Sequence, residues 1–172
     1  MLQAAKYSTI EPLRAGRRVH IRALTPADQA DFLAAVGQTS AASLFRRFFS
    51  PKRGFTQQEI AFFLHADFIE HVALVAVATE GGRPVIVGGG RYIVEHPGQA
   101  EPAFLVTDRH QGQGIGSALL RHLAVIARGA GLKELTAQVL RENVAMLRVF
   151  DKSGFRVTGR AAGIVYLSLQ LD

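Results

Sequence analysis

A glycine-rich hexapeptide at residues 111–116, QGQGIG, separates a strand-like run from a long amphipathic helix, and this arrangement constrains the fold strongly. The preceding run, 102–107, is apolar and has the pattern of an extended segment. Apolar residues then recur at helical spacing, at Ile115, Leu119, Leu123, Ile126 and Ala127. A glycine turn that opens a helix leaves backbone N–H groups unpaired, and the helix N-terminus adds partial positive charge. The sequence therefore predicts a phosphate-binding turn.

The glycines alone leave three interpretations open. A dinucleotide-binding turn needs Gly-x-Gly-x-x-Gly early in a strand–helix–strand unit, whereas Gly112, Gly114 and Gly116 are one residue short and lie late in the chain. A nucleoside-triphosphate loop needs Gly-Lys-Ser or Gly-Lys-Thr, and neither tripeptide occurs. The third interpretation is a tight strand-to-helix turn that binds no ligand.

A second motif further along the chain favours a phosphate-bearing ligand. Residues 143–155 read NVAMLRVFDKSGF, and a strand-like segment at 134–140 separates them from the glycine turn. The two motifs in this order resemble the GNAT superfamily of N-acetyltransferases, which use acetyl-CoA. The residues that carry the resemblance are Gln111, Gly114, Gly116, Asn143, Gly154 and Phe155.

Composition is that of a small globular protein. The chain has 172 residues, 48% hydrophobic and 20% charged, which excludes a disordered chain and suits one domain. It has no cysteine, so disulfides and thiolate ligands are excluded. The longest apolar run, 72–78, is too short to span a bilayer, and the N-terminus lacks the apolar core of a signal peptide. We expect a cytoplasmic protein with no membrane partner.

The periodicity predicts a mixed α/β domain. We expect a loosely held arm over residues 1–16 and the domain over 17–172. Strands are expected at 19–24, 71–79, 84–95, 101–107, 134–140, 155–159 and 163–171. Helices are expected over 25–36, from 57, from 115 and over 143–152. Gly88-Gly89-Gly90 inside a strand predicts a bulge or a close backbone approach. The expected class is a single-domain GNAT fold, with a mixed, mainly antiparallel sheet and helices on both faces.

The resemblance implies which residues hold acetyl-CoA as cosubstrate. The backbone amides of Leu105 or Val106 would polarise the thioester carbonyl. Asn143 would contact the pantetheine arm, although a plain helix N-cap is an equally good interpretation of this residue. Backbone donors to the pyrophosphate would come from the turn and the first helical residues, which are Gln111, Gln113, Gly114, Ile115, Gly116 and Ser117.

Glu101 is the candidate general base. It opens the strand that leads to the glycine turn, and a carboxylate can take the proton that an acceptor ammonium must lose before it attacks. Glu95 is its rival, and an ordinary solvated glutamate is the other interpretation. The chain departs from the family at Phe150, where many members carry a tyrosine that protonates the CoA thiolate. The general acid is therefore unassigned.

The central residues indicate the acceptor class. Residues 43–51, 73–76 and 100–104 are similar to those of bacterial Pat-type protein lysine acetyltransferases, which acetylate the active-site lysine of acyl-CoA synthetases. Protein lysine is thus the first choice of acceptor. The alternatives are a small-molecule amine and a non-catalytic acyl-CoA sensor. The net charge of +6 also permits an RNA partner, but it is equally explained by the polyanionic cosubstrate, and we do not expect nucleic-acid binding. A monomer or a homodimer is compatible with the sequence.

Overall fold

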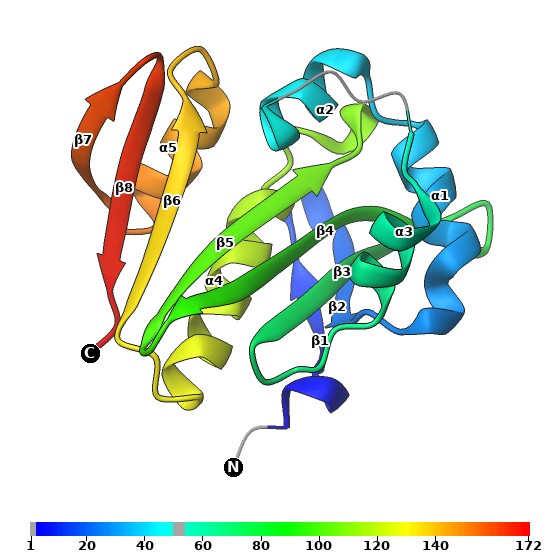
Figure 1. Cartoon of the computed structure of the whole chain (residues 1–172). Helices are drawn as coiled ribbons and strands as arrows, with labels where there is room; N and C mark the ends of the chain where they lie inside the picture. The colour runs from blue at the N-terminus through cyan, green and yellow to red at the C-terminus, as the bar shows by residue number, and fades with distance from the viewer. Residues whose placement is uncertain (1–2, 50–53) are drawn as a thin grey trace.

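An eight-stranded sheet forms the centre of the computed structural model, which describes residues 3–49 and 54–172 (Figure 1). Its order is β1-β2-β3-β4-β5-β6-β8-β7, and every neighbouring pair is antiparallel except β5 with β6. The strands are β1 Ser8–Pro12, β2 Arg18–Ala23, β3 His71–Glu80, β4 Arg83–His96, β5 Gln99–Val106, β6 Glu134–Leu140, β7 Arg156–Ala161 and β8 Ile164–Gln170.

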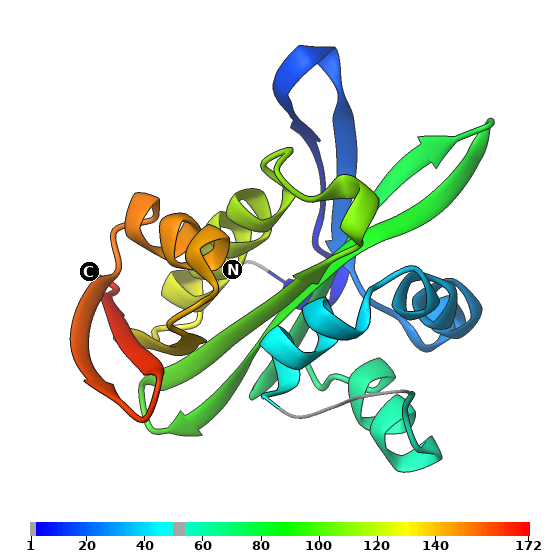
Figure 2. The ribbon, with the colours of Figure 1, turned by 90° about the horizontal axis from the view of Figure 1, so that it is seen from above.

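Helices cover both faces of the sheet (Figure 2). On one face lie α4 Ile115–Gly129 and α5 Val144–Lys152, whose apolar residues join the larger buried core. On the other face lie α1 Gln29–Gly37, α2 Ala41–Phe48 and α3 Gln57–Leu64. There a smaller core gathers Leu24, Ile60, Leu64, Ala73, Val75 and Ile86. The expected fold class is confirmed. Within the described residues, no helix is long and apolar enough to cross a membrane.

The N-terminal segment differs from the expectation. Residues 8–12 form β1, which pairs antiparallel with β2 from Ser8–Arg22 to Pro12–Arg18, so a loosely held arm is wrong for this part. Helix α2 was not expected either. It begins after Ser40, whose hydroxyl accepts a hydrogen bond from the N–H of Ser43, as an N-cap does. The sequence also predicts that Ser50-Pro51 breaks the phenylalanine-rich stretch 44–55, and these two residues lie outside the described part of the chain.

The glycine triplet of β4 allows close packing on α4. A register shift between Ala76 and Val77 leaves Val87 of β4 without a partner in β3 and marks a bulge directly before these glycines. A Cβ atom built on Gly90 would lie 3.2 Å from Leu123 Cδ1 and 3.4 Å from Phe104 Cβ. The close approach, one of the two alternatives expected for the triplet, is therefore present, while the bulge lies one residue earlier, and the missing side chains let the central helix lie directly on the sheet.

Strands β5 and β6 share only the beginning of their length. They pair at Gln99–Glu134 and Ala100–Leu135, and their backbones then diverge (Figure 1); this divergence of the two strands is called the opening below. The glycine turn and the N-terminus of α4 follow directly on the C-terminal end of β5. The opening and the turn thus lie at the same end of the molecule.

Candidate active site

The glycine turn has the backbone geometry of an anion site. Gly112 and Gly114 have φ angles of 76° and 92°, in the left-handed region that glycine adopts without strain. Gly114 is the N-cap of α4, and the first helical hydrogen bond runs from Ala118 N to Gly114 O at 3.0 Å. The N–H groups of residues 115–117 therefore have no partner within the helix. Together with the helix dipole, these donors fit the pyrophosphate of a coenzyme.

The glutamines of the turn use their side chains to build the loop. Gln111 Nε2 donates to Val106 O at 3.0 Å and to Ser43 Oγ at 3.2 Å. Gln113 Nε2 donates to Arg109 O at 3.4 Å. A further bond joins Ser40 N to Asp108 Oδ1 at 3.1 Å, so α2 is fastened to the turn at two points. The backbone of the turn stays available for a ligand.

Leu105 and Val106 lie at the end of β5, beside the opening toward β6. Strand β5 pairs with β4 along its length, but its other edge loses its partner after Ala100. Unpaired edge N–H and C=O groups suit an extended amide-containing arm such as pantetheine. The sequence-predicted residues of the cosubstrate site therefore lie together, from the opening to the first turn of α4.

Two residues at α5 have clear structural roles. Asn143 is the N-cap of α5, and its Oδ1 accepts a hydrogen bond from Met146 N at 3.3 Å. Phe150 is 3% exposed and packs between Phe104 and Phe155, with ring centroids 5.4 and 4.7 Å away. Tyr92, a possible substitute acid, is 1% exposed, and burial raises its pKa to about 12. It is therefore unsuited to donating a proton.

Glu101 lies on the opposite face of the sheet from α4. Its side chain projects on the same side of β5 as Ala103 and Leu105, because side chains alternate along a strand. Burial, the charge of Glu95 and a hydrogen bond with Glu95 raise the pKa of Glu101 to about 7, while the charge of Arg47 lowers it. A bulge between Val94 and His96 brings Glu95 next to Glu101. The two candidates for the base thus form one carboxylate pair.

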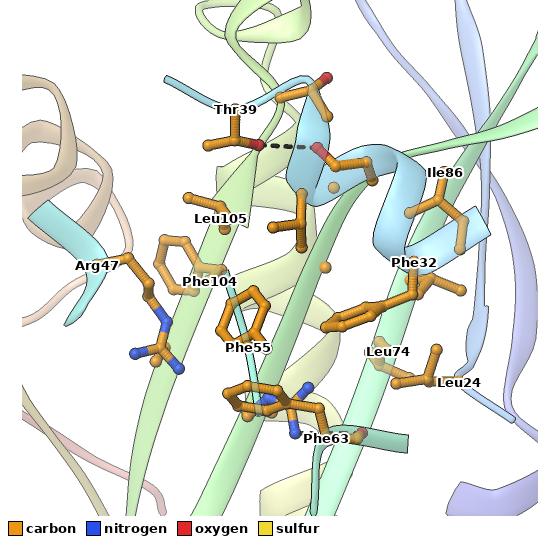
Figure 3. Close-up of a pocket in the computed structure, with 18 of the residues that line it drawn as sticks. Leu24, Phe32, Thr39, Arg47, Phe55, Phe63, Leu74, Ile86, Phe104 and Leu105 are labelled. Carbon is orange, nitrogen blue, oxygen red and sulfur yellow. Dashed lines mark hydrogen bonds between the residues drawn. The ribbon is translucent and has the colours of Figure 1, made fainter. Parts of the chain in front are cut away.

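A cavity of about 70 Å³ lies on this face, between the sheet and helices α1, α2 and α3. Its wall is largely aromatic and aliphatic, and Phe32, Phe55, Phe63 and Phe104 surround it (Figure 3). The cavity extends to the end of β5 where a thioester would lie, because its lining includes Gly88, Gly89, Leu105 and Thr107. The cavity therefore connects the predicted acyl position with the interior of the acceptor face.

Two arginines line this apolar cavity, and the sequence analysis missed both as site residues. Arg91 comes from β4 and is 9% exposed; Arg47 comes from α2 and runs along the edge of the cavity (Figure 3). Burial and the charge of Arg47 lower the pKa of Arg91 to about 9. Burial lowers the pKa of Arg47 to about 10, although Glu101 raises it. The signal available in the sequence was an arginine inside a strand whose neighbours are apolar or glycine.

His110 is held by its neighbours in the structure. Its Nε2 lies 2.6 Å from Glu80 Oε1 and its Nδ1 lies 2.7 Å from Thr107 Oγ1. Both ring nitrogens are thus engaged, and the residue supports the end of β5 rather than reaching the phosphate position.

A sequence comparison agrees with the fold, the opening between β5 and β6 and the glycine turn before α4. The profile of the Acetyltransferase (GNAT) family matches residues 39–155, and the chain belongs to this family. The family is one of acetyltransferases, and the geometry of the turn fits the pyrophosphate of a coenzyme.

Particular relatives narrow the likeness further. The chain is 33% identical to acetyltransferase Pat of Mycolicibacterium smegmatis over 144 residues, 83% of this chain and 42% of Pat. It is 35% identical to an L-methionine sulfoximine/L-methionine sulfone acetyltransferase of Salmonella typhimurium over 94 residues, 49% of this chain and 52% of that protein. The chain thus spans about half the length of these two relatives. The GNAT domain of S. lividans PAT superposes with a TM-score of 0.88 at 33% identity, covering 95% of this chain and 97% of that domain.

Proposed function

We propose that the chain transfers acetyl from acetyl-CoA to a primary amine by direct attack, with Glu101 as the general base. The observation that carries the proposal is the position of this carboxylate, four residues before Leu105 on the face that holds the cavity. Four residues of strand span about 13 Å between backbone positions, so a proton from an amine at the thioester would reach Glu101 through a short chain of water molecules.

The proton balance agrees with this assignment. An alkylammonium has a pKa of about 10 and must lose a proton before its nitrogen can attack the thioester carbon. Glu101, with its pKa raised to about 7 by burial and by Glu95, is a stronger base than an ordinary carboxylate and is ionised above neutrality. The C–N bond forms, the C–S bond breaks, and the CoA thiolate leaves. The amides of Leu105 and Val106 would support the carbonyl oxygen.

Two classes of acceptor fit this transfer, and the first candidate is a lysine side chain of a protein such as an acyl-CoA synthetase. The similarity to Pat and to the GNAT domain of S. lividans PAT supports this choice. A small amine is the second candidate, and the apolar cavity lined by two arginines favours it. The relative that acetylates L-methionine sulfoximine supports the same candidate.

Transfer of labelled acetyl into a cell extract tests the proposal. The extract is separated into protein and small-molecule fractions after reaction with the wild type, Glu101→Gln or Glu95→Gln. We expect Glu101→Gln to lower the rate by about 10²- to 10⁴-fold while acetyl-CoA binding is retained. Glu95→Gln changes the exposed member of the pair and should lower the rate much less. Label in protein supports a lysine acceptor, and label in small molecules supports the second candidate. Full turnover by Glu101→Gln would refute the assignment of the base.

A further inference from the structure

The two arginines of the acceptor cavity are an unusual feature in so apolar a place. A charged side chain is costly to bury unless another charge or a set of hydrogen bonds compensates it. Burial disfavours the charged form of both arginines, the charge of Arg47 disfavours it further at Arg91, and a partial compensation comes from Glu101 acting on Arg47. An anion that entered the cavity would supply the compensation that this pair lacks.

The hydrogen bonds of the pair leave donors unused. Arg91 Nη1 donates to His71 Nε2 at 2.6 Å and, weakly, to Phe63 O at 3.4 Å, while its guanidinium lies 4.5 Å from the Phe63 ring centroid. His71 can accept this bond because burial, followed by the charge of Arg91, lowers its pKa to about 4 and keeps it neutral. The Nε and Nη2 donors of Arg91 have no hydrogen-bond acceptor in the described part of the chain.

Arg47 is even less engaged. Its guanidinium lies 4.6 Å from the Phe48 ring centroid, and within residues 3–49 and 54–172 it has neither a hydrogen-bond acceptor nor a carboxylate within ion-pair distance. Among those residues, no side-chain N or O atom that is fully shielded from solvent lacks a partner. The free donors of both arginines therefore keep some exposure to solvent, although the surrounding protein desolvates their charge, and both residues line the cavity.

We propose that Arg47 and Arg91 form a binding site for a carboxylate of the acceptor, and that the acceptor is a free amino acid. Guanidinium groups bind carboxylates through paired, charge-assisted hydrogen bonds, and the site is desolvated, which strengthens them. The site flanks the strand positions of Glu101 and Leu105, so the carboxylate and the amine of one small molecule can be held together. The aromatic lining fits an apolar side chain on that molecule.

This inference rests on the proposed acetyl transfer and selects the second acceptor class, since a lysine within a protein carries no carboxylate near its amine. A carboxylate could also arrive on the donor, as the distal group of a dicarboxylic acyl-CoA. The shared chemistry is carboxylate recognition, and the experiment separates the two sources.

The test compares free L-amino acids that have apolar side chains, from alanine to phenylalanine, with their amides as acceptors of acetyl from acetyl-CoA. An amide keeps the side chain and the α-amino group but carries no negative charge, and its lower ammonium pKa by itself favours the amide, so a preference for the free acid cannot come from the amine. Release of CoA is followed with a thiol reagent, to which this cysteine-free chain contributes no background. We expect at least one free acid to exceed its amide at least tenfold in kcat/KM. If no free acid exceeds its amide, the inference is wrong.

Variants assign that preference to the arginines. Arg47→Gln should lower the acid-to-amide ratio at least tenfold, and Arg47→Lys, which keeps charge but loses the paired geometry, should lower it partly. The ratio cancels any effect of Arg47 on Glu101, because both acceptors use the same base. Arg46→Gln is the matched control. Arg46 is exposed, and its ion pair with Glu142 is long, at 3.9 Å, so the acid-to-amide ratio of this variant should equal that of the wild type. An unchanged ratio in Arg47→Gln would overturn the assignment.

Two further results separate the possible failures. Succinyl-CoA is offered in place of acetyl-CoA with an amino acid amide, and faster transfer than from acetyl-CoA would place the carboxylate on the donor and overturn the acceptor assignment. Absence of transfer to every amine, with acetyl-CoA binding intact, would refute the proposed function itself. Arg91→Gln is tested in the same way. Because Arg91 is buried, a thermal melt first establishes that this variant is folded.

Discussion

At the scale of single residues, the charges on the acceptor face form one system. Glu95 and Glu101 share a carboxylate pair, Arg47 acts on Glu101, and Arg91 is held by His71. Coupled groups titrate together, so an apparent pKa belongs to the pair rather than to one carboxylate. The pH dependence of catalysis therefore depends on residues from β4, β5 and α2 at once.

The acidic limb of the pH profile is the first consequence. Glu101 must be ionised to act as a base, and burial with the charge of Glu95 raises its pKa to about 7, so kcat/KM should fall as the pH drops below about 7. The charge of Arg47 lowers this pKa. With an acceptor that has no carboxylate, Arg47→Gln should therefore move the limb to higher pH by about one unit. A profile that stays in place, or moves to lower pH, would contradict the charge coupling.

At the scale of secondary-structure elements, the packing of α4 on β4 depends on the absence of side chains at the glycine triplet. A methyl group at Gly90 would press on Leu123, Phe104 and Leu119, which are buried. Gly90→Ala should lower the free energy of unfolding by about 1–3 kcal/mol, as overpacking does. Urea denaturation measures this change.

The control for this substitution is Gly159→Ala in β7. A Cβ atom at Gly159 would meet no atom within 4 Å, and its φ angle is not in the left-handed region. Its effect should be within about 0.5 kcal/mol. Equal losses in the two variants would show that the close approach of α4 is not what makes Gly90 necessary.

The elements with a strong local pattern could be predicted from the sequence. Strand β6 was expected at 134–140, where the structure has it, and α4 has its expected buried face. Strand β1 was missed because its sequence, STIEP, ends in proline and its side chains alternate only between exposed and half-buried. It is a strand because β2 pairs with it, and such long-range pairing leaves little local signal.

In the candidate site, too, the parts with a local sequence pattern could be predicted, and the parts that depend on packing could not. The turn follows from glycines that need positive φ, and Glu101 follows from its place on the strand before the turn. The contact of Glu95 with Glu101 needs a bulge, and the inward direction of Arg47 depends on how α2 packs against β5. Arg46 and Arg47 look alike in the sequence, yet one is exposed and the other lines the cavity.

At the scale of the whole molecule, the N-terminal hairpin is fastened to the central helix. Glu11 of β1 accepts hydrogen bonds from Arg121 and from His122 Nε2, the latter at 2.7 Å. Tyr7 OH lies within hydrogen-bond distance of His122 Nδ1. These contacts join residues more than 100 positions apart and place β1 at the edge of the sheet.

Loss of this attachment should lower global stability. Glu11→Gln removes the charge of a carboxylate that accepts hydrogen bonds from Arg121 and His122, and we expect the free energy of unfolding to fall by about 1–3 kcal/mol. Glu142→Gln is the comparison, because Glu142 is exposed and its distance from Arg46 is 3.9 Å, and exposed pairs contribute about 0–1 kcal/mol. Guanidinium denaturation of both variants measures the difference. A Glu11→Gln variant as stable as the wild type would show that β1 is held by its pairing with β2 alone.

The two hydrogen-bonded links between α2 and the glycine turn have a kinetic consequence. Ser40 and Ser43 tie the helix that carries Arg47 to the loop that receives the pyrophosphate. A coenzyme that orders this loop also orders one wall of the acceptor cavity, so the two substrates should bind in a compulsory order, with acetyl-CoA first. By thermodynamic reciprocity, a bound acceptor then raises the affinity for acetyl-CoA by the same factor by which acetyl-CoA raises the affinity for the acceptor.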